Sequence, residues 1–244
     1  MPSLNFLPLV VLFLGFAYAQ GISSQPYYFE RLDANNTALL IIDHQVGLVP
    51  LVRDYEPDEF RNNLLAHAAI GNVFNLPTVL SSTSETGPNG PLVPEIVAMH
   101  PNAPYIKRQG EIDAWDNADF RAAVQATGKQ QLILAGITTD VCATFLALSL
   151  RQEGYSVWVN AQASGAASKT VAEDAKARMR DAGVHVISPY VVVSDLLRTW
   201  ANNTYNVQAI GWDFAYWTLR GYMTDAHAAA IQNGTLVPGE LDFN

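Results

Sequence analysis

An unbroken apolar run that ends in an acid, at residues 37–43 (TALLIID), is the feature that most constrains the fold of this chain. Such a run is typical of a parallel strand that is buried on both faces. Similar runs recur at residues 77–82, 131–136, 155–159 and 184–187, and residues 105–107 are a candidate for a further short strand. The chain is therefore expected to contain a sheet with two covered faces.

Helical spacing of apolar residues fills the stretches between these runs, at residues 58–74, 117–126, 140–153 and 169–181. Strands and helices that alternate in one chain predict an α/β fold: a three-layer α-β-α architecture with a Rossmann-like, mostly parallel sheet, helices on both faces and right-handed crossovers. Ligands of such sheets bind at the carboxyl ends of the strands. Reactive side chains that directly follow strands are therefore the candidates for function.

The N-terminus has the form of a secretory signal peptide. An apolar run at residues 6–16 is followed by the small residues Ala17 and Ala19, so residues 1–19 are expected to be removed by cleavage after Ala19. The run is about half of the roughly 20 apolar residues that a transmembrane helix needs. No Lys or Arg precedes the run, and a retained N-terminal anchor is the alternative. The mature protein is expected to be secreted, extracellular and free of the membrane.

The remaining chain of about 225 residues suits one α/β domain. We expect a leader at residues 20–36, a core α/β domain at 37–200 and an aromatic C-terminal extension at 201–244, which packs on the domain or on a neighbouring subunit. The net charge of -9 and the lack of a Lys/Arg cluster argue against nucleic acid as a partner. Sequons at Asn35, Asn202 and Asn233 offer sites for glycosylation.

Three residues follow predicted strands and should meet at one rim of the sheet: Asp43, Lys107 and Cys142, the only cysteine. A helix N-terminus and the Lys107 ammonium would both favour the thiolate of Cys142. Asp43 could accept the thiol proton and pass it to a leaving amine. Amides of the turn before Cys142 could form an oxyanion hole.

Each of these features also has a purely structural interpretation. An acid at a strand end often caps a helix, and a lone cysteine is ordinarily a small buried hydrophobic residue. Thr139 or Asp140 could simply be the N-cap of the helix that carries the cysteine. Position alone leaves both interpretations open.

Four segments, in this order, carry a family resemblance: ALLIIDHQVGL, SSTSETGPNGPLVPE, YIKRQGEIDAWDN and LILAGITTDVCATFLAL. Together they resemble the isochorismatase-like cysteine hydrolase superfamily, which includes nicotinamidases and N-carbamoylsarcosine amidases, and within it the YcaC-related branch. The similarity extends over residues 37–200. The resemblance implies the isochorismatase-like hydrolase fold and assembly into a homo-oligomer.

The resemblance also implies roles for individual residues. Asp43 would be the general base, Lys107 the cation that supports the thiolate, and Cys142 the nucleophile that forms a thioester-like intermediate. A cis peptide bond would join Ile137 to Thr138, and the amides of Thr138 and Cys142 would form the oxyanion hole.

The same alignment suggests His44, Gln45, Thr83 and Trp115 as substrate contacts, although Trp115 could equally pack on the next helix. Substrate specificity is expected from the loops at residues 84–94 and 162–168. Nicotinamidases bind a metal through an Asp-x-His pair, whereas the comparable residues 54–56 read Asp-Tyr-Glu. We therefore expect no metal and no cofactor.

The sequence thus predicts a secreted cysteine hydrolase that cleaves a small amide, ureide or related acyl substrate through a Cys-Asp-Lys triad. Two alternatives stay open at this point. One is an extracellular isochorismatase that hydrolyses isochorismate, and the other is a non-catalytic small-molecule binding protein on the same scaffold.

Overall fold

The computed structural model describes residues 29–200 and 205–219. The expected signal peptide at residues 1–19, most of the leader, the sequons at Asn202 and Asn233, and residues 220–244 of the C-terminal extension lie outside this described part. Asn35, in the remaining sequon, is exposed. No described helix is long and apolar enough to cross a membrane.

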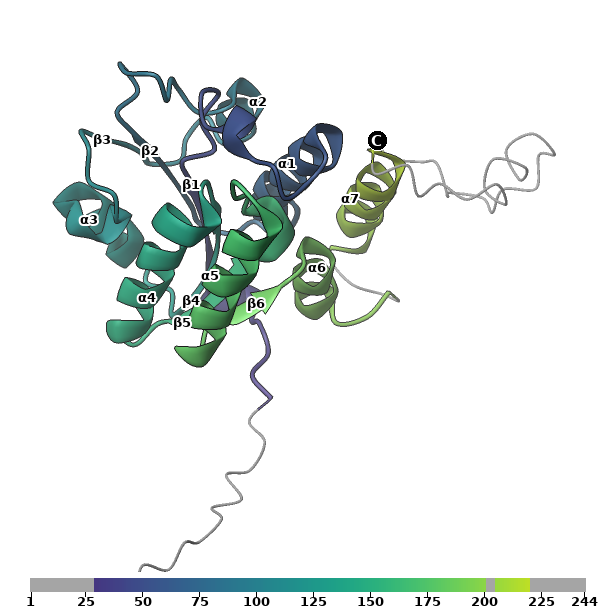
Figure 1. Cartoon of the computed structure of the whole chain (residues 1–244). Coiled ribbons are helices and arrows are strands. Elements are labelled where there is room, and N and C mark those ends of the chain that lie inside the picture. The colour runs from purple at the N-terminus through teal and green to yellow at the C-terminus, as the bar shows by residue number, and fades with distance from the viewer. Residues whose placement is uncertain (1–28, 201–204, 220–244) are drawn as a thin grey trace, which may run out of the picture. The chain divides into compact units, whose positions relative to one another are not determined.

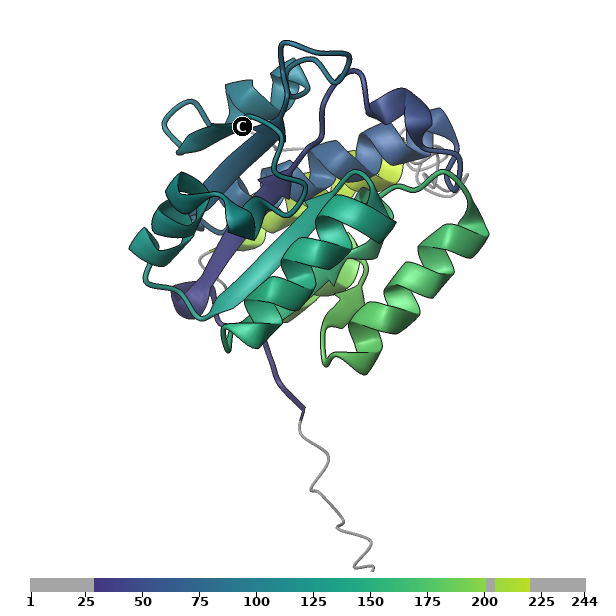
Figure 2. The same ribbon diagram turned by 60° about the vertical axis from the view of Figure 1, so that its left-hand side comes forward.

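A six-stranded sheet forms the centre of the domain, and all of its strands are parallel (Figures 1 and 2). Its strand order is β3-β2-β1-β4-β5-β6. The strands are β1 (Thr37–Ile42), β2 (Thr78–Thr83), β3 (Tyr105–Arg108), β4 (Gln131–Gly136), β5 (Ser156–Asn160) and β6 (His185–Ile187). The expected Rossmann-like sheet is confirmed, and it is fully parallel.

The central strands bury both of their faces. In β1, Leu39 and Ile41 enter one apolar cluster, whereas Leu40 and Ile42 enter another on the opposite side of the sheet. Successive side chains of a strand point to opposite faces, so an uninterrupted apolar run is what a doubly covered strand requires. This burial explains why β1 and β4 have no polar alternation in the sequence.

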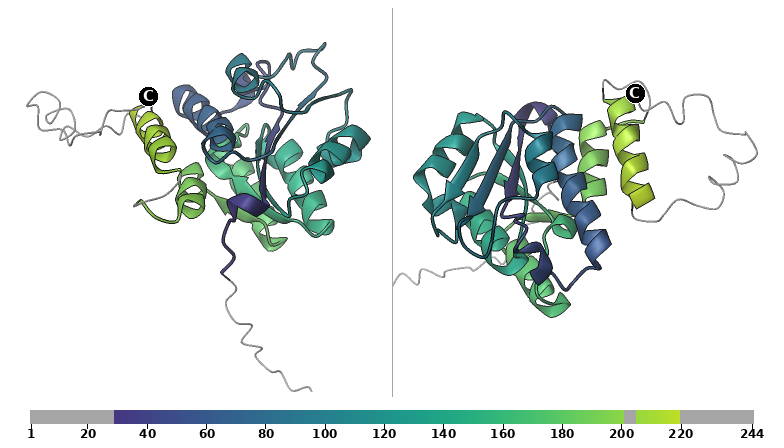
Figure 3. Two further views of the ribbon diagram at one scale, coloured as in Figure 1. Left: turned by 180° about the vertical axis from the view of Figure 1, so that it is seen from behind. Right: turned by 90° about the horizontal axis from the view of Figure 1, so that it is seen from above.

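Helices cover the two faces as separate layers (Figure 3). One layer contains α1 (Pro57–Val73), α2 (Pro94–Met99) and α6 (Pro189–Leu197). The other contains α3 (Ala118–Ala126), α4 (Thr144–Gln152) and α5 (Lys169–Asp181). A final helix, α7 (Asn206–Leu219), lies on the outer side of α1 and α6. The expected three-layer arrangement is confirmed.

The described part of the C-terminal extension packs on α1. Trp212 Nε1 donates a hydrogen bond of 3.0 Å to the carbonyl of Ala66, and Asn62 Nδ2 donates one of 3.1 Å to the carbonyl of Tyr216. The rings of Trp212 and Tyr216 stack with their centroids 4.8 Å apart. These two aromatic side chains therefore join the apolar cluster beneath them.

The strand order reverses between β1 and β4, because the chain moves outward to β2 and β3 on one side and to β5 and β6 on the other. In sheets with such a reversal, ligands bind in the crevice outside the carboxyl ends of the strands, which here are the ends of β1 and β4. Gly136 ends β4, and a Cβ atom there would lie 2.8 Å from the carbonyl oxygen of Ile42. A glycine thus lets the two strand ends approach closely at the crevice.

Candidate active site

Asp43 lies at this crevice, directly after β1, and its side chain is fully buried. Its backbone has a φ of 54°, a left-handed conformation that non-glycine residues rarely adopt. The carboxylate accepts a hydrogen bond from the Arg108 guanidinium and interacts with the Cys142 thiol. Burial raises the pKa of Asp43, and the Arg108 charge partly opposes that rise. The carboxylate is thus both held in place and kept basic.

Arg108 is the cation of this site, and it is fully buried at the end of β3. Its Nη2 donates to Asp43, and its Nε donates to Ser81 Oγ at 2.9 Å. Its Nη1 donates to the backbone carbonyls of Glu111 and, at 3.4 Å, Ile112. Each nitrogen of the planar guanidinium therefore has a protein acceptor, and these hydrogen bonds fix the guanidinium against Asp43.

Lys107 does not occupy the position that the sequence suggested. Its side chain is 57% exposed, and its Nζ lies 2.9 Å from Glu85 Oε2. Neighbouring residues of a strand point to opposite faces, so Arg108 can face Asp43 only if Lys107 faces away. The expected placement of Lys107 beside Cys142 is wrong, and Arg108 stands there instead.

A loop after β3 holds the carbonyls that face Arg108. The carboxylate of Glu111 accepts hydrogen bonds from Asn117 Nδ2 at 2.9 Å and from the backbone amides of Gln109 and Gly110 at 3.0 and 3.1 Å. The hydrogen bond from Asn117, followed by backbone amide bonds, lowers the pKa of Glu111 to about 2. Glu111 therefore stays ionised near neutral pH and shapes the loop around Arg108.

Cys142 lies in a π-helical turn, η4 (Thr139–Ala143), that leads into α4. Burial first, and then the charge and hydrogen bond of Asp43, raise the pKa of the Cys142 thiol to about 12. The Arg108 charge and a backbone hydrogen bond to Thr138 act in the opposite direction. This raised pKa opposes the expected bias toward thiolate and favours the neutral thiol near neutral pH.

The turn before Cys142 supplies backbone amides near its sulfur. The Ile137–Thr138 peptide bond is cis, as the resemblance implied. Thr138 provides the backbone hydrogen bond to the Cys142 thiol, whereas the Thr139 amide donates to the Gly165 carbonyl at 2.9 Å. The Thr139 amide is therefore occupied, and an oxyanion hole formed by Thr138 and Cys142 stays a prediction.

His44 and Gln45 are fully buried, and their expected contact with a substrate stays a prediction. His44 Nε2 lies 2.7 Å from the carbonyl oxygen of Ala163, which can only accept, so this nitrogen carries the proton. Gln45 exchanges two hydrogen bonds of 2.9 Å with the backbone of Thr83 and donates a further one to Gly90. Both side chains hold loops around the site.

The two other suggested substrate contacts have different surroundings. Thr83 is partly buried, and its described hydrogen bonds involve backbone atoms, so its contact with a substrate stays a prediction. Trp115 is only 8% exposed and packs edge-on against Tyr155, with ring centroids 6.0 Å apart. Its environment matches the alternative in which Trp115 is a packing residue.

No group of three or more His, Cys, Asp or Glu side chains within residues 29–200 and 205–219 is arranged to hold a metal ion. Asp54, in the segment comparable to the metal-binding region of nicotinamidases, accepts a hydrogen bond of 2.8 Å from the Ala166 amide. Asp54 thus holds the loop at residues 165–166, whose Gly165 carbonyl accepts the hydrogen bond from the Thr139 amide.

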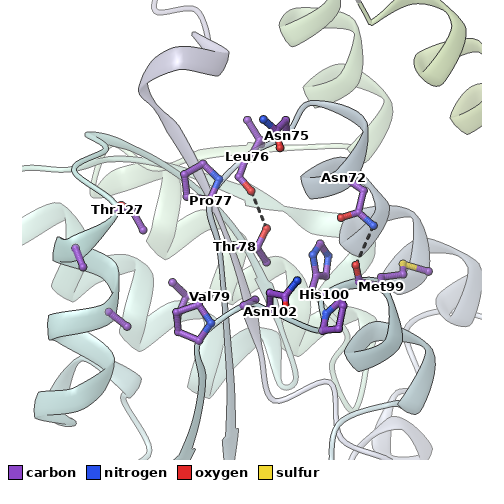
Figure 4. Close-up of a pocket in the computed structure, with 15 residues that line it drawn as sticks. Asn72, Asn75, Leu76, Pro77, Thr78, Val79, Met99, His100, Asn102 and Thr127 are labelled. Atoms are coloured by element: carbon purple, nitrogen blue, oxygen red, sulfur yellow. Dashed lines mark hydrogen bonds between the residues drawn. The ribbon is translucent and has the colours of Figure 1, made fainter.

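A cavity of about 600 Å³ lies at the opposite, amino end of β2 (Figure 4). Several of its polar groups already have partners: Asn72 Nδ2 donates to the Met99 carbonyl at 3.0 Å, and Thr78 Oγ1 donates to the Leu76 carbonyl at 3.1 Å. His100 Nε2 likewise bonds the carbonyl of Ala68. This cavity contains none of the reactive groups, so the crevice at Cys142 is the candidate active site.

Comparisons with known proteins identify the family of this chain. A model of the isochorismatase domain matches residues 37–189. The probable hydrolase YcaC of Escherichia coli K12 is 50% identical over 180 residues, which are 74% of this chain and 86% of that protein.

Two solved structures resemble this one. The first is YcaC from Pseudomonas aeruginosa with hexane-2,5-diol and covalent acrylamide, with a TM-score of 0.75 and 47% identity over 86% of this chain and 100% of that one. The second, the YcaC gene product of E. coli, is described as an octameric hydrolase of unknown specificity, with a TM-score of 0.77 and 45% identity over 86% and 99% of the two chains. The resemblance in sequence is thereby confirmed, and this chain belongs to the isochorismatase-like hydrolase superfamily, in its YcaC-related branch.

Proposed function

We propose that this protein is a cysteine hydrolase that cleaves the C–N bond of a small amide or ureide, with Cys142 as nucleophile and Asp43 as general base. The observation that carries this proposal is the buried Asp43 carboxylate, which Arg108 holds in place and which interacts with the Cys142 thiol. A nucleophile that lies beside an oriented base is the arrangement that covalent catalysis needs. Arg108 takes the part that the sequence suggested for Lys107.

In the first half of the reaction, Asp43 accepts the thiol proton as Sγ of Cys142 attacks the substrate carbonyl carbon. The carbonyl oxygen becomes an oxyanion beside the amides of Thr138 and Cys142, which stabilise it. Asp43 then gives its proton to the leaving nitrogen, the C–N bond breaks, and an amine or ammonia departs. The product is a thioester on Cys142.

In the second half, Asp43 removes a proton from a water molecule that attacks the thioester carbonyl. The C–S bond breaks, the acid is released, and the proton returns to the thiol. The raised pKa of Asp43 suits both steps, because a general base works best when its pKa is near the working pH. Arg108 keeps the carboxylate aimed at the sulfur in both halves.

The P. aeruginosa relative is described with covalent acrylamide, an electrophile to which nucleophiles such as thiols add at the vinyl carbon. That description supports a reactive nucleophile in the relative and leaves open which bond of a substrate is cleaved. A second candidate is isochorismate hydrolysis, which the name of the matching domain favours. That reaction, as the family resemblance implies, does not need the cysteine, so the two candidates differ in their dependence on Cys142.

The experiment compares the purified protein with a Cys142→Ser variant on a panel of amides, ureides and isochorismate, with products followed by mass spectrometry. Loss of the nucleophile is expected to lower amide hydrolysis by on the order of 10³-fold or more. Isochorismate turnover that survives in the variant would favour the second candidate. Binding of a compound without turnover by either protein would favour a non-catalytic binding protein.

An Asp43→Asn variant tests the role of the base separately. The Asp43 charge and hydrogen bond raise the pKa of the Cys142 thiol, so this pKa is expected to fall in the variant. Hydrolysis is nevertheless expected to fall by roughly 10²- to 10⁴-fold, because the proton acceptor is lost. Thiolate absorbance against pH gives the thiol pKa. A more ionised thiol with undiminished hydrolysis would exclude Asp43 as the base.

We also propose that the protein is secreted and works as a homo-oligomer. The signal-peptide pattern of residues 1–19 supports secretion, and the description of the E. coli relative as an octamer supports assembly. Expression of the full chain in a secreting host should place it in the medium with a new N-terminus at Gln20. Sedimentation of that protein at a monomer mass would exclude the assembly.

A further inference from the structure

We infer that the Cys142 site selects uncharged substrates and excludes compounds that carry a carboxylate beside the reacting carbonyl. This inference rests on the proposed function and narrows its substrate class. Arg108 carries the positive charge of the site. Protein acceptors already bind its guanidinium nitrogens, and the inference comes from this arrangement.

Arg108 has no guanidinium face turned to solvent, because the residue is 1% exposed and its side chain is fully buried. Its Nε, Nη1 and Nη2 groups each have a protein acceptor, in Ser81, the carbonyls of Glu111 and Ile112, and Asp43. A substrate carboxylate would have to displace one of these acceptors. Arg108 therefore orients the base rather than binding an anion.

Arg108 is the cation that pairs with Asp43, and its charge also acts to lower the pKa of both Asp43 and Cys142. Lys107, the nearest cation along the chain, points to the other face and pairs with Glu85. The described site thus has no free positive charge to offer.

The charge balance of the site is already complete without a substrate. The Asp43 carboxylate and the Arg108 guanidinium cancel, and the Cys142 thiol is neutral. An added carboxylate would leave an unpaired negative charge next to Asp43, and burying an unpaired charge is costly. An uncharged amide adds no such cost. Isochorismate carries two carboxylates, so the same balance counts against the second candidate function.

The test uses two alkylating agents that match in size and differ in charge, iodoacetamide and iodoacetate. Their rates at Cys142 are measured by mass spectrometry and divided to give a preference, which is compared with the same preference for free N-acetylcysteine. We expect the preference for iodoacetamide at Cys142 to exceed that of the free thiol by roughly tenfold or more, which equals about 1.4 kcal/mol. An equal or reversed preference would overturn the inference.

An added cation at the site should weaken this selection. Ile112 is 55% exposed, and its carbonyl oxygen lies 3.4 Å from Arg108 Nη1, so an Ile112→Lys variant places an ammonium at the loop over Arg108. Val191, 47% exposed on α6 at the far edge of the sheet, gives the matched Val191→Lys control. Ile112→Lys is expected to reduce the preference severalfold and Val191→Lys to leave it unchanged. Equal effects would assign the preference to net charge and contradict a local origin.

Hydrolysis provides an independent arm, with propionamide compared with the monoamide of malonic acid, in which a carboxylate replaces the methyl group. Alkylation needs no turnover, so the charge preference can be measured even if the proposed function fails. If Cys142→Ser keeps full hydrolysis, the proposed function fails while the alkylation ratio still decides the inference. Faster hydrolysis of the malonic monoamide by the wild-type protein would overturn the inference and leave the proposed function intact.

Discussion

Arg108 and Lys107 are adjacent in β3, yet their side chains have opposite environments. Arg108 is fully buried in a network with Asp43 and Ser81, whereas Lys107 is mostly exposed beside Glu85. A buried pair that loses one member leaves an uncompensated charge in a medium of low dielectric. An exposed pair is weakened by water and salt. The two neighbouring cations should therefore respond very differently to substitution.

An Arg108→Lys variant is expected to lose about 3 kcal/mol in its free energy of unfolding, because one ammonium cannot donate to all the acceptors that the planar guanidinium reaches. Amide hydrolysis should fall with it, since Asp43 loses its support. A Lys107→Ala variant should change stability by less than about 1 kcal/mol and leave hydrolysis near the wild-type rate. Urea unfolding and product release measure the two effects.

The comparison of these two variants decides which cation serves the site. If Lys107→Ala abolishes hydrolysis while Arg108→Lys retains it, the assignment from the structure is wrong. A glutamine at position 108 provides a further control, because it removes the charge and keeps some hydrogen-bonding capacity. It should be less active than Arg108→Lys.

The alternation of side chains along β3 favours Arg108 over Lys107 as the residue that faces the site. In the segment YIKR, Ile106 packs against the same apolar cluster as Cys142, so the pleat places Arg108, two residues later, on that face. A lysine fits the role of a lone supporting cation, and the resemblance therefore directed attention to Lys107. The choice between neighbouring residues depends on the register with β2, which pairs Thr83 with Arg108. That register is a tertiary property.

At the scale of elements, strongly patterned segments were predictable. The expected strand at residues 131–136 and helix at 169–181 match β4 and α5 residue for residue. The helices α2, α6 and α7 were not predicted from the sequence. The six residues of α2 are too few for a helical period, and the run of valines in α6 favours a strand by propensity. Packing against the sheet overrides that propensity.

A local signal for α6 was nevertheless present. Ser188 Oγ accepts a hydrogen bond of 3.3 Å from the Val191 amide, and Pro189 occupies the first turn. A serine followed by proline is a good start for a helix, because the serine caps an amide that has no helical partner and the proline needs none. Capping chemistry therefore gave better information about this element than apolar periodicity.

The loop after β1 depends on a close approach that only glycine allows. A Cβ atom at Gly47 would lie 1.9 Å from the Pro88 carbonyl oxygen and 2.8 Å from that of Asn89, and the Gly47 amide donates to the Asn89 carbonyl at 2.8 Å. A Gly47→Ala variant must separate the two loops, which is expected to cost about 1–3 kcal/mol of unfolding free energy. Gln45 holds the same loop pair, so hydrolysis should fall as well.

Gly110→Ala is the matched control for this element. The nearest atom to a Cβ there is Ser84 Oγ at 4.0 Å, so the methyl group fits without displacement. Urea unfolding of both variants measures the difference. A Gly47→Ala protein that unfolds at the wild-type denaturant concentration would show that the two loops are free to separate.

At the scale of the whole molecule, two buried histidines connect the core to the active-site loops. His67 Nδ1 lies 2.9 Å from Asn160 Nδ2, and its Nε2 lies 3.1 Å from the Leu40 carbonyl. The ring of His44 lies 6.2 Å from that of His67 and bonds the loop at Ala163. Burial lowers the pKa of His44 to about 4 and that of His67 to about 3. The sequence gave no sign of this pair, because its members are 23 residues apart and come from different elements.

The lowered pKa values make the fold sensitive to acid. The unfolded chain binds protons at these histidines near pH 6.5, whereas the folded protein keeps both rings neutral until a much lower pH. The stability that this difference provides is complete above pH 6.5 and is lost as the pH falls toward 4 for His44 and toward 3 for His67. For His44 the loss amounts to about 2 kcal/mol at pH 5.

A His44→Gln variant isolates this contribution, because an amide can still donate to the Ala163 carbonyl and does not titrate. Its free energy of unfolding is expected to fall by about 2 kcal/mol less than that of the wild-type protein between pH 7 and pH 5. Thr78→Val serves as the control, since it removes a buried hydrogen bond to Leu76 without removing a titrating group. That variant should be less stable than wild type by a similar amount at both pH values. Urea unfolding at the two pH values gives the comparison, and an unchanged pH dependence in His44→Gln would show that protonation of His44 does not limit acid stability.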